Sequence, residues 1–521
     1  MSNPGLPSNW SVVPLGRIVA PTRPRILPSE LPELPYVGME HVEAHSMRLL
    51  GTVPAGTMKS SGVRFHRGDI LYGRLRPYLN KVWLANVDGL CSAEFIVLPP
   101  SAALESRYLS YLLNSADFVS FASHLNEGDR PRVDFDQLAQ FPVPVPPRLE
   151  QARIAEEIEK QFTRLDAGVA ALKRVQAQLK RYRASVLKAA CEGRLVPTEA
   201  ELARREKRDY APADKLLARI LKERRGRWEA DQLAMMKAAG KPPKGNDTKT
   251  GLAKPTSADV SSRPTLPDGW AWARMEDLSI AGRGGIFAGP FGTIFKARDF
   301  RDEGIPIIFL RHVAPGRYLT HKPGFMDRKI WEERFRDEYS VWGGELLVTK
   351  LGEPPGVAAL FPSTLGPAMV TPDVIAMRAD DRLVLPKFLM HFLNSDSARS
   401  VASGLAFGTT RLRLTIPLFR EIWVPLPPLA EQGRIVAEID AQLSVADAAG
   451  AAVVKNLALA AQLRSAVLAH AFAGKLMPQE ATDEPASKLL ERISASVENK
   501  SVPKQGRAKQ TTAVPKMKAT R

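Results

Sequence analysis

The chain has 521 residues, of which 44% are hydrophobic and 25% are charged, and its formal net charge is +17. This length favours two or more domains, and the globular composition, with neither a signal peptide nor a membrane-spanning apolar run, predicts a soluble cytoplasmic protein. Its two cysteines, Cys91 and Cys191, are too far apart for a CxxC metal site and argue against a disulfide framework.

In chain order the sequence predicts six segments. They are a globular block over 1–148, a long helix over 149–197, a helical connector with a flexible linker over 198–265, a second block over 266–429, a second long helix over 430–478, and a short amphipathic segment with a disordered basic tail over 479–521. Positive charge is concentrated outside the two blocks, so charge alone does not distinguish a nucleic-acid partner from solvated basic segments.

One phrase occurs twice, as VPVPPRLEQARIAEEI from Val143 and as VPLPPLAEQGRIVAEI from Val424. Ten of the 16 residues are identical, and the offset is 281 residues. With shifted offsets of 280, 276 and 260 residues, YLSYLLNS matches FLMHFLNS, RGDILYGRL matches GGELLVTKL, and LPSNW matches LPDGW. The chain is therefore expected to contain a pseudo-twofold internal repeat of block, proline run and long helix.

Each proline pair holds the chain extended and fixes where the following helix begins, and Glu150 and Glu431 place negative charge in the first helical turn. Apolar residues then recur with a period near 3.5, which is typical of a coiled-coil seam. The predicted seam residues are Ile154, Ile158, Phe162, Leu165, Leu172, Ile435, Ile439, Leu443, Val453 and Leu457. We expect the two helices to pair within the chain; the alternatives are packing on their own blocks or pairing with another chain.

The predicted fold class is α+β, with two mixed α/β blocks separated by two long antiparallel coiled-coil helices. We find no GxxxxGK[ST] phosphate loop, no amine-methylation motif and no recognisable catalytic set. The two histidines of HVEAH, His41 and His45, lack the HExxH pattern and do not predict a zinc site. The sequence therefore predicts a binding protein without a catalytic site or a metal site.

The duplicated PVPPRLEQARI and PLPPLAEQGRI, the helix exits EGRLVP and AGKLMP, and the block starts LPSNW and LPDGW resemble the specificity subunit of type I restriction-modification systems. YVGMEHVE, GDILYGRLRPYLNKVWLA and SAEFIVL are similar to one type of target-recognition domain of that family, and FAGPFGTIFKARDFRDEGIPII to the start of another.

This resemblance implies that each block reads one half of a bipartite double-stranded DNA target, while the paired helices set the gap and dock two modification subunits. It also implies restriction subunits that translocate and cleave DNA. S-adenosylmethionine, ATP and Mg²⁺ are then expected on those partners, with no cofactor on this chain. The role of this chain in bacterial defence is then to determine which DNA sequence is methylated at adenine.

Arginine can clamp a phosphate or read guanine, so the repeated arginine pairs are the first candidates for DNA contact. The candidate residues are Arg130, Arg132, Arg411 and Arg413, followed by Arg74, Arg76, Lys81 and Lys350. The alternative is a solvated strand edge whose cations deter aggregation. The neighbouring aromatics Tyr72, Tyr78 and Trp83 are expected in the core rather than stacked on bases.

Two other functions remain open at this point. One is a self-contained restriction-methylation enzyme, against which the missing methylation motif argues. The other is a coiled-coil scaffold that does not bind DNA.

Overall fold

The computed structural model describes residues 5–22, 25–238, 263–280, 284–290, 299–408 and 412–501. Most of the predicted linker, the C-terminal tail beyond 501, and Arg411 lie outside these residues. The chain divides into two compact units, one formed by Met1–Lys173 with Val454–Arg521 and the other by Arg174–Val453. Each long helix therefore contributes one part to each unit.

The first unit contains the first block, a mixed α/β structure. Its strands are β1 (Ser11–Pro14), β2 (Arg25–Ile26), β3 (Pro35–Val37), β4 (Val53–Pro54), β5 (Gly62–Phe65), β6 (Ile70–Gly73), β7 (Val82–Leu84), β8 (Gly89–Cys91), β9 (Phe95–Leu98) and β10 (Pro142–Val145). They form a five-stranded sheet β2-β5-β8-β3-β4, a three-stranded sheet β7-β6-β9 and the pair β1-β10. The helices are α1 (Ser106–Leu112), α2 (Ala116–Ser123) and α3 (Phe135–Leu138).

The second block, in the second unit, has the same kind of architecture with more elements. Its strands are β11 (Ala271–Arg274), β12 (Ile286–Ala288), β13 (Phe300–Arg301), β14 (Ile305–Ile308), β15 (Val313–Ala314), β16 (Arg317–Tyr318), β17 (Gly324–Met326), β18 (Ser340–Val341), β19 (Leu346–Thr349), β20 (Ala358–Leu360), β21 (Ala368–Val370), β22 (Val374–Met377) and β23 (Trp423–Leu426). The helices are α7 (Met275–Leu278), α8 (Arg328–Arg334), α9 (Arg336–Tyr339), α10 (Pro386–Leu393), α11 (Asp396–Leu405) and α12 (Ile416–Arg420).

The sheets of the second block are β13-β17-β14-β21-β18, β12-β22-β19-β20, and the pairs β11-β23 and β15-β16. Each block contains one parallel strand pair within its five-stranded sheet, β3 with β8 and β14 with β21. In each block, the proline run before the long helix forms a strand that pairs antiparallel with the first strand of the block.

The long helices are α4 (Arg148–Cys191) and α13 (Leu429–Phe472). The repeated glutamate at the start of each is fully buried, and a tryptophan indole donates a hydrogen bond to it. Trp10 Nε1 lies 3.1 Å from each carboxylate oxygen of Glu150, and Trp270 Nε1 lies 2.9 Å from Glu431 Oε1. Charge in the first helical turn is thus only part of the reason for the repeated glutamate.

The repeated glutamine next to it holds each helix start to its block. Gln151 Nε2 donates to the carbonyls of Ala103 at 3.0 Å and Pro146 at 2.9 Å, and Gln151 Oε1 accepts from the Glu105 N–H at 2.8 Å. Gln432 makes the same three bonds in the second unit. Its partners are the carbonyls of Leu383 and Pro427 and the N–H of Leu385.

The ten predicted seam residues are all buried or half-buried. Those in the first turns pack into the blocks: Ile154, Ile158 and Phe162 belong to the core of the first, and Ile435 and Ile439 to that of the second. The first seam positions therefore join each helix to its own block, which is the alternative packing left open by the sequence.

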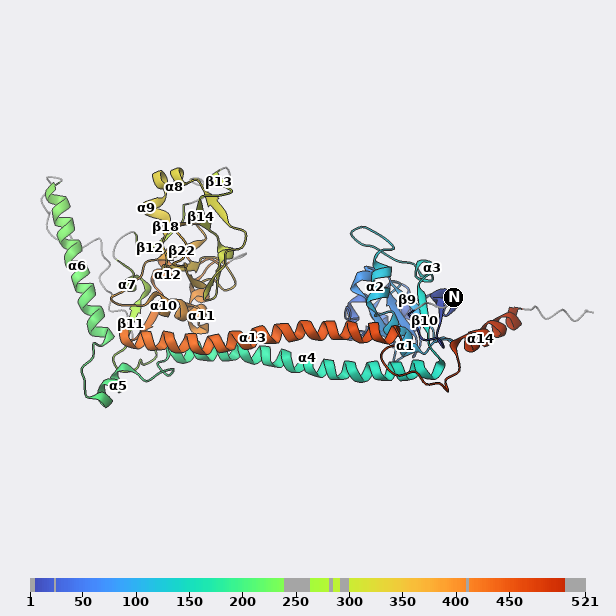
Figure 1. Cartoon of the computed structure of the whole chain (residues 1–521). Helices are drawn as coiled ribbons and strands as arrows, with labels where there is room; N and C mark the ends of the chain where they lie inside the picture. The colour runs from blue at the N-terminus through green and yellow to red at the C-terminus, as the bar shows by residue number, and fades with distance from the viewer. Residues whose placement is uncertain are drawn as a thin grey trace, which may run out of the picture. The chain divides into compact units, whose positions relative to one another are not determined.

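Later turns carry contacts between the two helices. In the first unit, Arg464 forms an ion pair with Asp166 at 2.9 Å and lies over the ring of Phe162. In the second unit, Tyr182 donates to Gln442 at 3.0 Å and Arg183 pairs with Asp447 at 2.6 Å. In each unit the end of one long helix lies beside the start of the other (Figure 1).

The segment that follows each long helix packs on the block that holds the start of the other helix. After α4 come α5 (Glu199–Glu206) and α6 (Ala213–Ala238), and the Ala213 N–H donates to Gly269 O at 2.8 Å. After α13 comes α14 (Ala486–Ser501), and the Ala486 N–H donates to Asn9 O at 2.9 Å. The first block is thereby completed by residues from the far end of the chain.

Helix α13 is also long and apolar enough, by length and composition, to cross a membrane, although the sequence did not suggest such a span. Alanines supply much of this apolar character. Both ends of the helix are embedded in block cores, through Ile435 and Ile439 at one end and Leu468 and Ala471 at the other. Between them the side chains of Val445, Val454 and Leu459 are exposed by 71%, 60% and 46%.

Candidate nucleic-acid interface

In the first block, the two predicted sets of cations lie on adjacent loops. The Arg76 N–H donates to Pro131 O at 2.7 Å, and the Val133 N–H donates to Arg74 O at 3.1 Å. The backbone thus brings the loop after β6, with Arg74 and Arg76, beside the loop that carries Arg132. The sequence had treated these as separate candidates.

Two carboxylates hold this cluster together. Arg132 Nη2 lies 2.5 Å from Glu94 Oε1, and Arg74 forms an ion pair with Asp134. The Arg132 side chain is still 58% exposed. Sequence reasoning missed both acids, although Asp134 lies two residues from Arg132 and Glu94 directly precedes β9. We call Arg74, Glu94, Arg132 and Asp134 the first cluster.

The second block repeats this arrangement with Lys350, Asp373 and Arg413, which we call the second cluster. The Leu414 N–H donates to Lys350 O at 2.8 Å, and the Lys350 N–H donates to Asp373 O at 2.9 Å. The first block has the corresponding bonds from Val133 to Arg74 and, at 2.9 Å, from the Arg74 N–H to Glu94 O. Arg413 Nη2 lies 3.9 Å from Asp373 Oδ1, as Arg132 pairs with Glu94.

The candidate cations differ in how accessible they are. Lys350 is only 7% exposed, and burial, followed by the charge of Arg413, lowers the pKa of its ammonium group. Lys81 is half-buried, and its Nζ donates to Met39 O at 2.5 Å. Arg130 is exposed, and within the described residues it has no ion-pair partner. Arg411 lies outside the described residues, so the second arginine pair is represented by Arg413 alone.

The aromatic residues beside the first cluster divide into two kinds. Tyr72 and Trp83 are buried in the core, as expected. The prediction was wrong for Tyr78, which is 45% exposed because it lies in the short 3-10 turn Pro77–Leu79 that interrupts the strand pattern. Tyr78 therefore offers an aromatic ring to solvent between Arg76 and Lys81.

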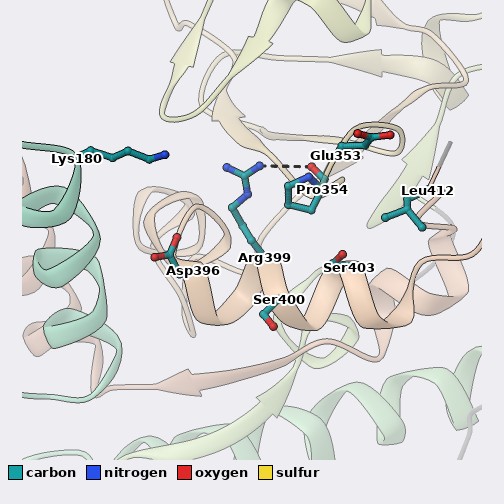
Figure 2. A pocket seen from close by; sticks show the side chains of 8 residues that line it. All are labelled: Lys180, Glu353, Pro354, Asp396, Arg399, Ser400, Ser403 and Leu412. Carbon is teal, nitrogen blue, oxygen red and sulfur yellow. Dashed lines mark hydrogen bonds between the residues drawn. The ribbon is translucent and has the colours of Figure 1, made fainter. Parts of the chain in front are cut away.

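Beside the second cluster, the second unit has an open hollow of about 680 Å³, shown in Figure 2. Its lining residues are Lys180, Glu353, Pro354, Asp396, Arg399, Ser400, Ser403 and Leu412. Lys180 extends from α4 toward Arg399, whose Nη2 donates to Pro354 O at 3.4 Å (Figure 2). Because two cations and two carboxylates line it, this hollow has no clear preference for an anion, and we do not count it among the DNA-contact candidates.

Among the residues that the structure describes, no three His, Cys, Asp or Glu side chains are grouped so that they could hold a metal ion. His41 has a structural contact instead, because its Nδ1 accepts a hydrogen bond from the Gly38 N–H at 2.9 Å. Each cluster offers one exposed arginine, Arg132 or Arg413, beside a carboxylate, and an arginine so placed can bind a phosphate or a base edge.

The architecture defines a class of protein with two mixed α/β blocks and two long helices. Residues 7–181, which include nearly all of the first block and most of α4, match the family described as Type I restriction modification DNA specificity domain. The chain thus carries this DNA specificity domain in its first part, and it is similar to specificity subunits of type I restriction enzymes.

Known relatives agree with this assignment. The chain is 27% identical over 195 residues to the EcoDI specificity subunit of Escherichia coli, covering 37% of this chain and 44% of that one. It is 22% identical to the E. coli EcoBI specificity subunit, covering 68% and 64%, and 21% identical to the EcoEI subunit of the same species, covering 85% and 79%. The first two alignments thus span less than two thirds of those relatives.

A solved chain from a study of complex assembly and conformational transition of the type I R-M system has the same fold. The TM-score is 0.56 and the sequence identity 20%, and the match covers 90% of this chain and 99% of that chain.

Proposed function

We propose that this chain is the DNA sequence-specificity subunit of a type I restriction-modification complex. In this proposal each block is a target-recognition domain that reads one half of a split double-stranded DNA target. The observation that carries the proposal is the duplicated cluster. Cations from two adjacent loops are held by a carboxylate in the same backbone arrangement in both blocks.

The ion pairs inside each cluster are compatible with DNA binding. An exposed pair contributes little to folding, so a DNA phosphate or base can replace the carboxylate at small cost. The adjacent acids also reduce the net positive charge of each cluster. We therefore expect the chain alone to bind DNA weakly and in a salt-dependent way, with the partners completing the clamp.

The two long helices are proposed to form an antiparallel pair that sets the unspecified gap between the half-sites. The ion pairs Arg464–Asp166 and Arg183–Asp447 support such a pairing. The exposed apolar side chains Val445, Val454 and Leu459 of α13 are proposed as contacts for modification subunits.

The pseudo-symmetry of the blocks suits two modification subunits, one for each half of the target. S-adenosylmethionine is proposed to bind those subunits, and ATP with Mg²⁺ the restriction subunits. The chain itself is proposed to be non-catalytic and to provide recognition only.

The test uses the chain co-expressed with its modification subunit. We expect Arg132→Gln and Arg413→Gln each to lower adenine methylation of target DNA at least about tenfold, because each removes a charged DNA contact. Arg328→Gln is the matched control, since Arg328 is an exposed residue on α8 with a local partner, Glu332.

Co-purification of each variant with the modification subunit separates recognition from assembly. If both cluster variants assemble and methylate like the parent, the blocks merely scaffold the complex. If the purified chain methylates DNA without a partner, it is a self-contained enzyme instead.

A further inference from the structure

The same short turn follows one strand of the parallel pair in both blocks. In the first it is the 3-10 turn Met39–His41 after β3, and in the second Leu310–His312 after β14. The N–H of the preceding residue donates to the histidine Nδ1 in each case, from Gly38 at 2.9 Å and from Phe309 at 3.3 Å. The turns are therefore structural equivalents, although their sequences, GMEH and FLRH, share only the histidine.

These turns lie beside the two clusters. In the first block the Ser92 N–H donates to Val37 O at 3.0 Å, two residues before Glu94 of the first cluster. In the second block the Thr371 N–H donates to Ile308 O at 3.1 Å, two residues before Asp373 of the second cluster. Each turn thus begins one strand away from the carboxylate that holds the repeated arginine.

The residue before the histidine has opposite charge in the two blocks. It is Glu40 in the first, with a side chain 71% exposed, and Arg311 in the second, which is also exposed. The residue that precedes each turn, Gly38 or Phe309, accommodates the charged side chain. The Glu40 carboxylate lies over Gly38, where an added Cβ would be 2.3 Å from Oε1, whereas the Arg311 guanidinium lies 4.0 Å from the centre of the Phe309 ring.

Arg311 is held in place while most of its donors remain available. Its Nη2 donates to Lys322 O at 2.7 Å, which is its one hydrogen bond within the described part of the chain. The guanidinium also lies over the Phe309 ring, and a planar fork with free N–H groups is suited to a bidentate acceptor.

A carboxylate and a guanidinium recognise different base edges in the major groove. A carboxylate accepts a hydrogen bond from an exocyclic amino group and is repelled by phosphate, while a guanidinium donates to O6 and N7 of guanine. We propose that this turn reads a base in both blocks, as a hydrogen-bond acceptor in the first block and as a hydrogen-bond donor in the second. Glu40 accepts from a cytosine or adenine amino group in one half-site, and Arg311 donates to a guanine in the other.

This proposal rests on the proposed DNA-recognition function and is tested in the complex with the modification subunit. Methylated motifs are mapped for the parent, Glu40→Gln and Arg311→Gln, with Glu33→Gln and Arg328→Gln as exposed controls of like charge. Glu40→Gln should change the preference at one adenine or cytosine position of one half-site. Arg311→Gln should relax one guanine position of the other, each by about tenfold to hundredfold, with the gap unchanged.

Base analogues provide a second measurement that does not depend on how the variants fold. Replacing the identified guanine by 7-deazaguanine, which lacks the N7 acceptor, should weaken binding of the parent complex about tenfold and leave Arg311→Gln unaffected. The proposal is overturned if the assembled variants keep the parent motif, if neither half-site contains a guanine, or if the parent ignores the analogue. A parent that produces no split motif would instead refute the function on which this proposal rests.

Discussion

At the scale of single residues, the duplicated glutamate and glutamine show what a repeated motif does inside a fold. At the junction of block and helix, Gln151 and Gln432 each form hydrogen bonds with two backbone carbonyls and one backbone N–H. The sequence predicted the position of the helix start but not this role. A side-chain amide that bonds to backbone far along the chain leaves no local pattern.

We expect Gln432→Ala to loosen the start of α13. It leaves three backbone groups without their partner, which should cost about 3 kcal/mol. Hydrogen exchange of the first turns of α13 should then accelerate about hundredfold. Gln178→Ala, at an exposed position on α4, is the control and should change exchange little. Equal exchange in the two variants would refute the anchoring role.

The buried glutamate gives a pH dependence. Burial raises the pKa of Glu431 above its ordinary value near 4.5, although hydrogen bonds from the Glu199 N–H and the Trp270 indole oppose this. Because the folded state then binds the proton more tightly than the unfolded state, stability falls as pH rises from about 4.5 through the raised pKa.

Glu431→Gln removes this titration while it keeps an oxygen for Trp270. We expect the stability of the second unit, followed by tryptophan fluorescence during urea unfolding, to fall less for the variant than for the parent as pH rises through this range. Parallel pH profiles would contradict the raised pKa.

At the scale of elements, the connector helix α6 is fastened to the second block by a buried ion pair. Arg224 Nη2 lies 2.6 Å from Asp380 Oδ2, with side chains 14% and 6% exposed, and Arg224 Nη1 donates to Asp277 O at 2.9 Å. Hydrogen bonds from Arg382 and then from Arg224 hold the pKa of Asp380 well below its ordinary value. This stabilisation is complete above the ordinary pKa of an aspartate and is lost as pH falls below it.

Arg224→Ala should weaken the docking of α6 by about 2 kcal/mol, less than for an isolated buried pair because Arg382 still neutralises Asp380. Hydrogen exchange over residues 216–224 should accelerate at least about tenfold. Arg225→Ala removes only an exposed pair with Glu229 and is the control. Unchanged protection in Arg224→Ala would show that apolar contacts alone, such as Leu217 and Ile220 in the core, hold the helix.

At the scale of the whole molecule, the sequence predicted the features that repeat and missed those that depend on contacts between distant segments. Two mixed α/β blocks and two long helices were predictable, because proline runs and apolar periodicity are local signals. The family resemblance is confirmed by the comparisons. The bond from Ala486 to Asn9 was not predictable, since nothing near either residue specifies a partner over 470 residues away.

In the candidate site, too, the repeated residues were predictable from the sequence and their contacts with distant segments were not. The repeat selected Arg132 and Arg413, but the acids that hold them, Glu94 and Asp373, come from another strand edge and are visible only in three dimensions. The opposite charges of Glu40 and Arg311 also become comparable only when their turns are recognised as equivalent. Their role in reading bases stays a prediction.

The most direct test of the central claim is adenine-methylation mapping of DNA from cells that express the modification subunit with and without this chain. The account predicts a split motif, two short specified halves around a fixed unspecified gap, that appears only when the chain is present. A modification subunit that co-purifies with the chain but produces no new motif would contradict the claim that these two blocks recognise DNA.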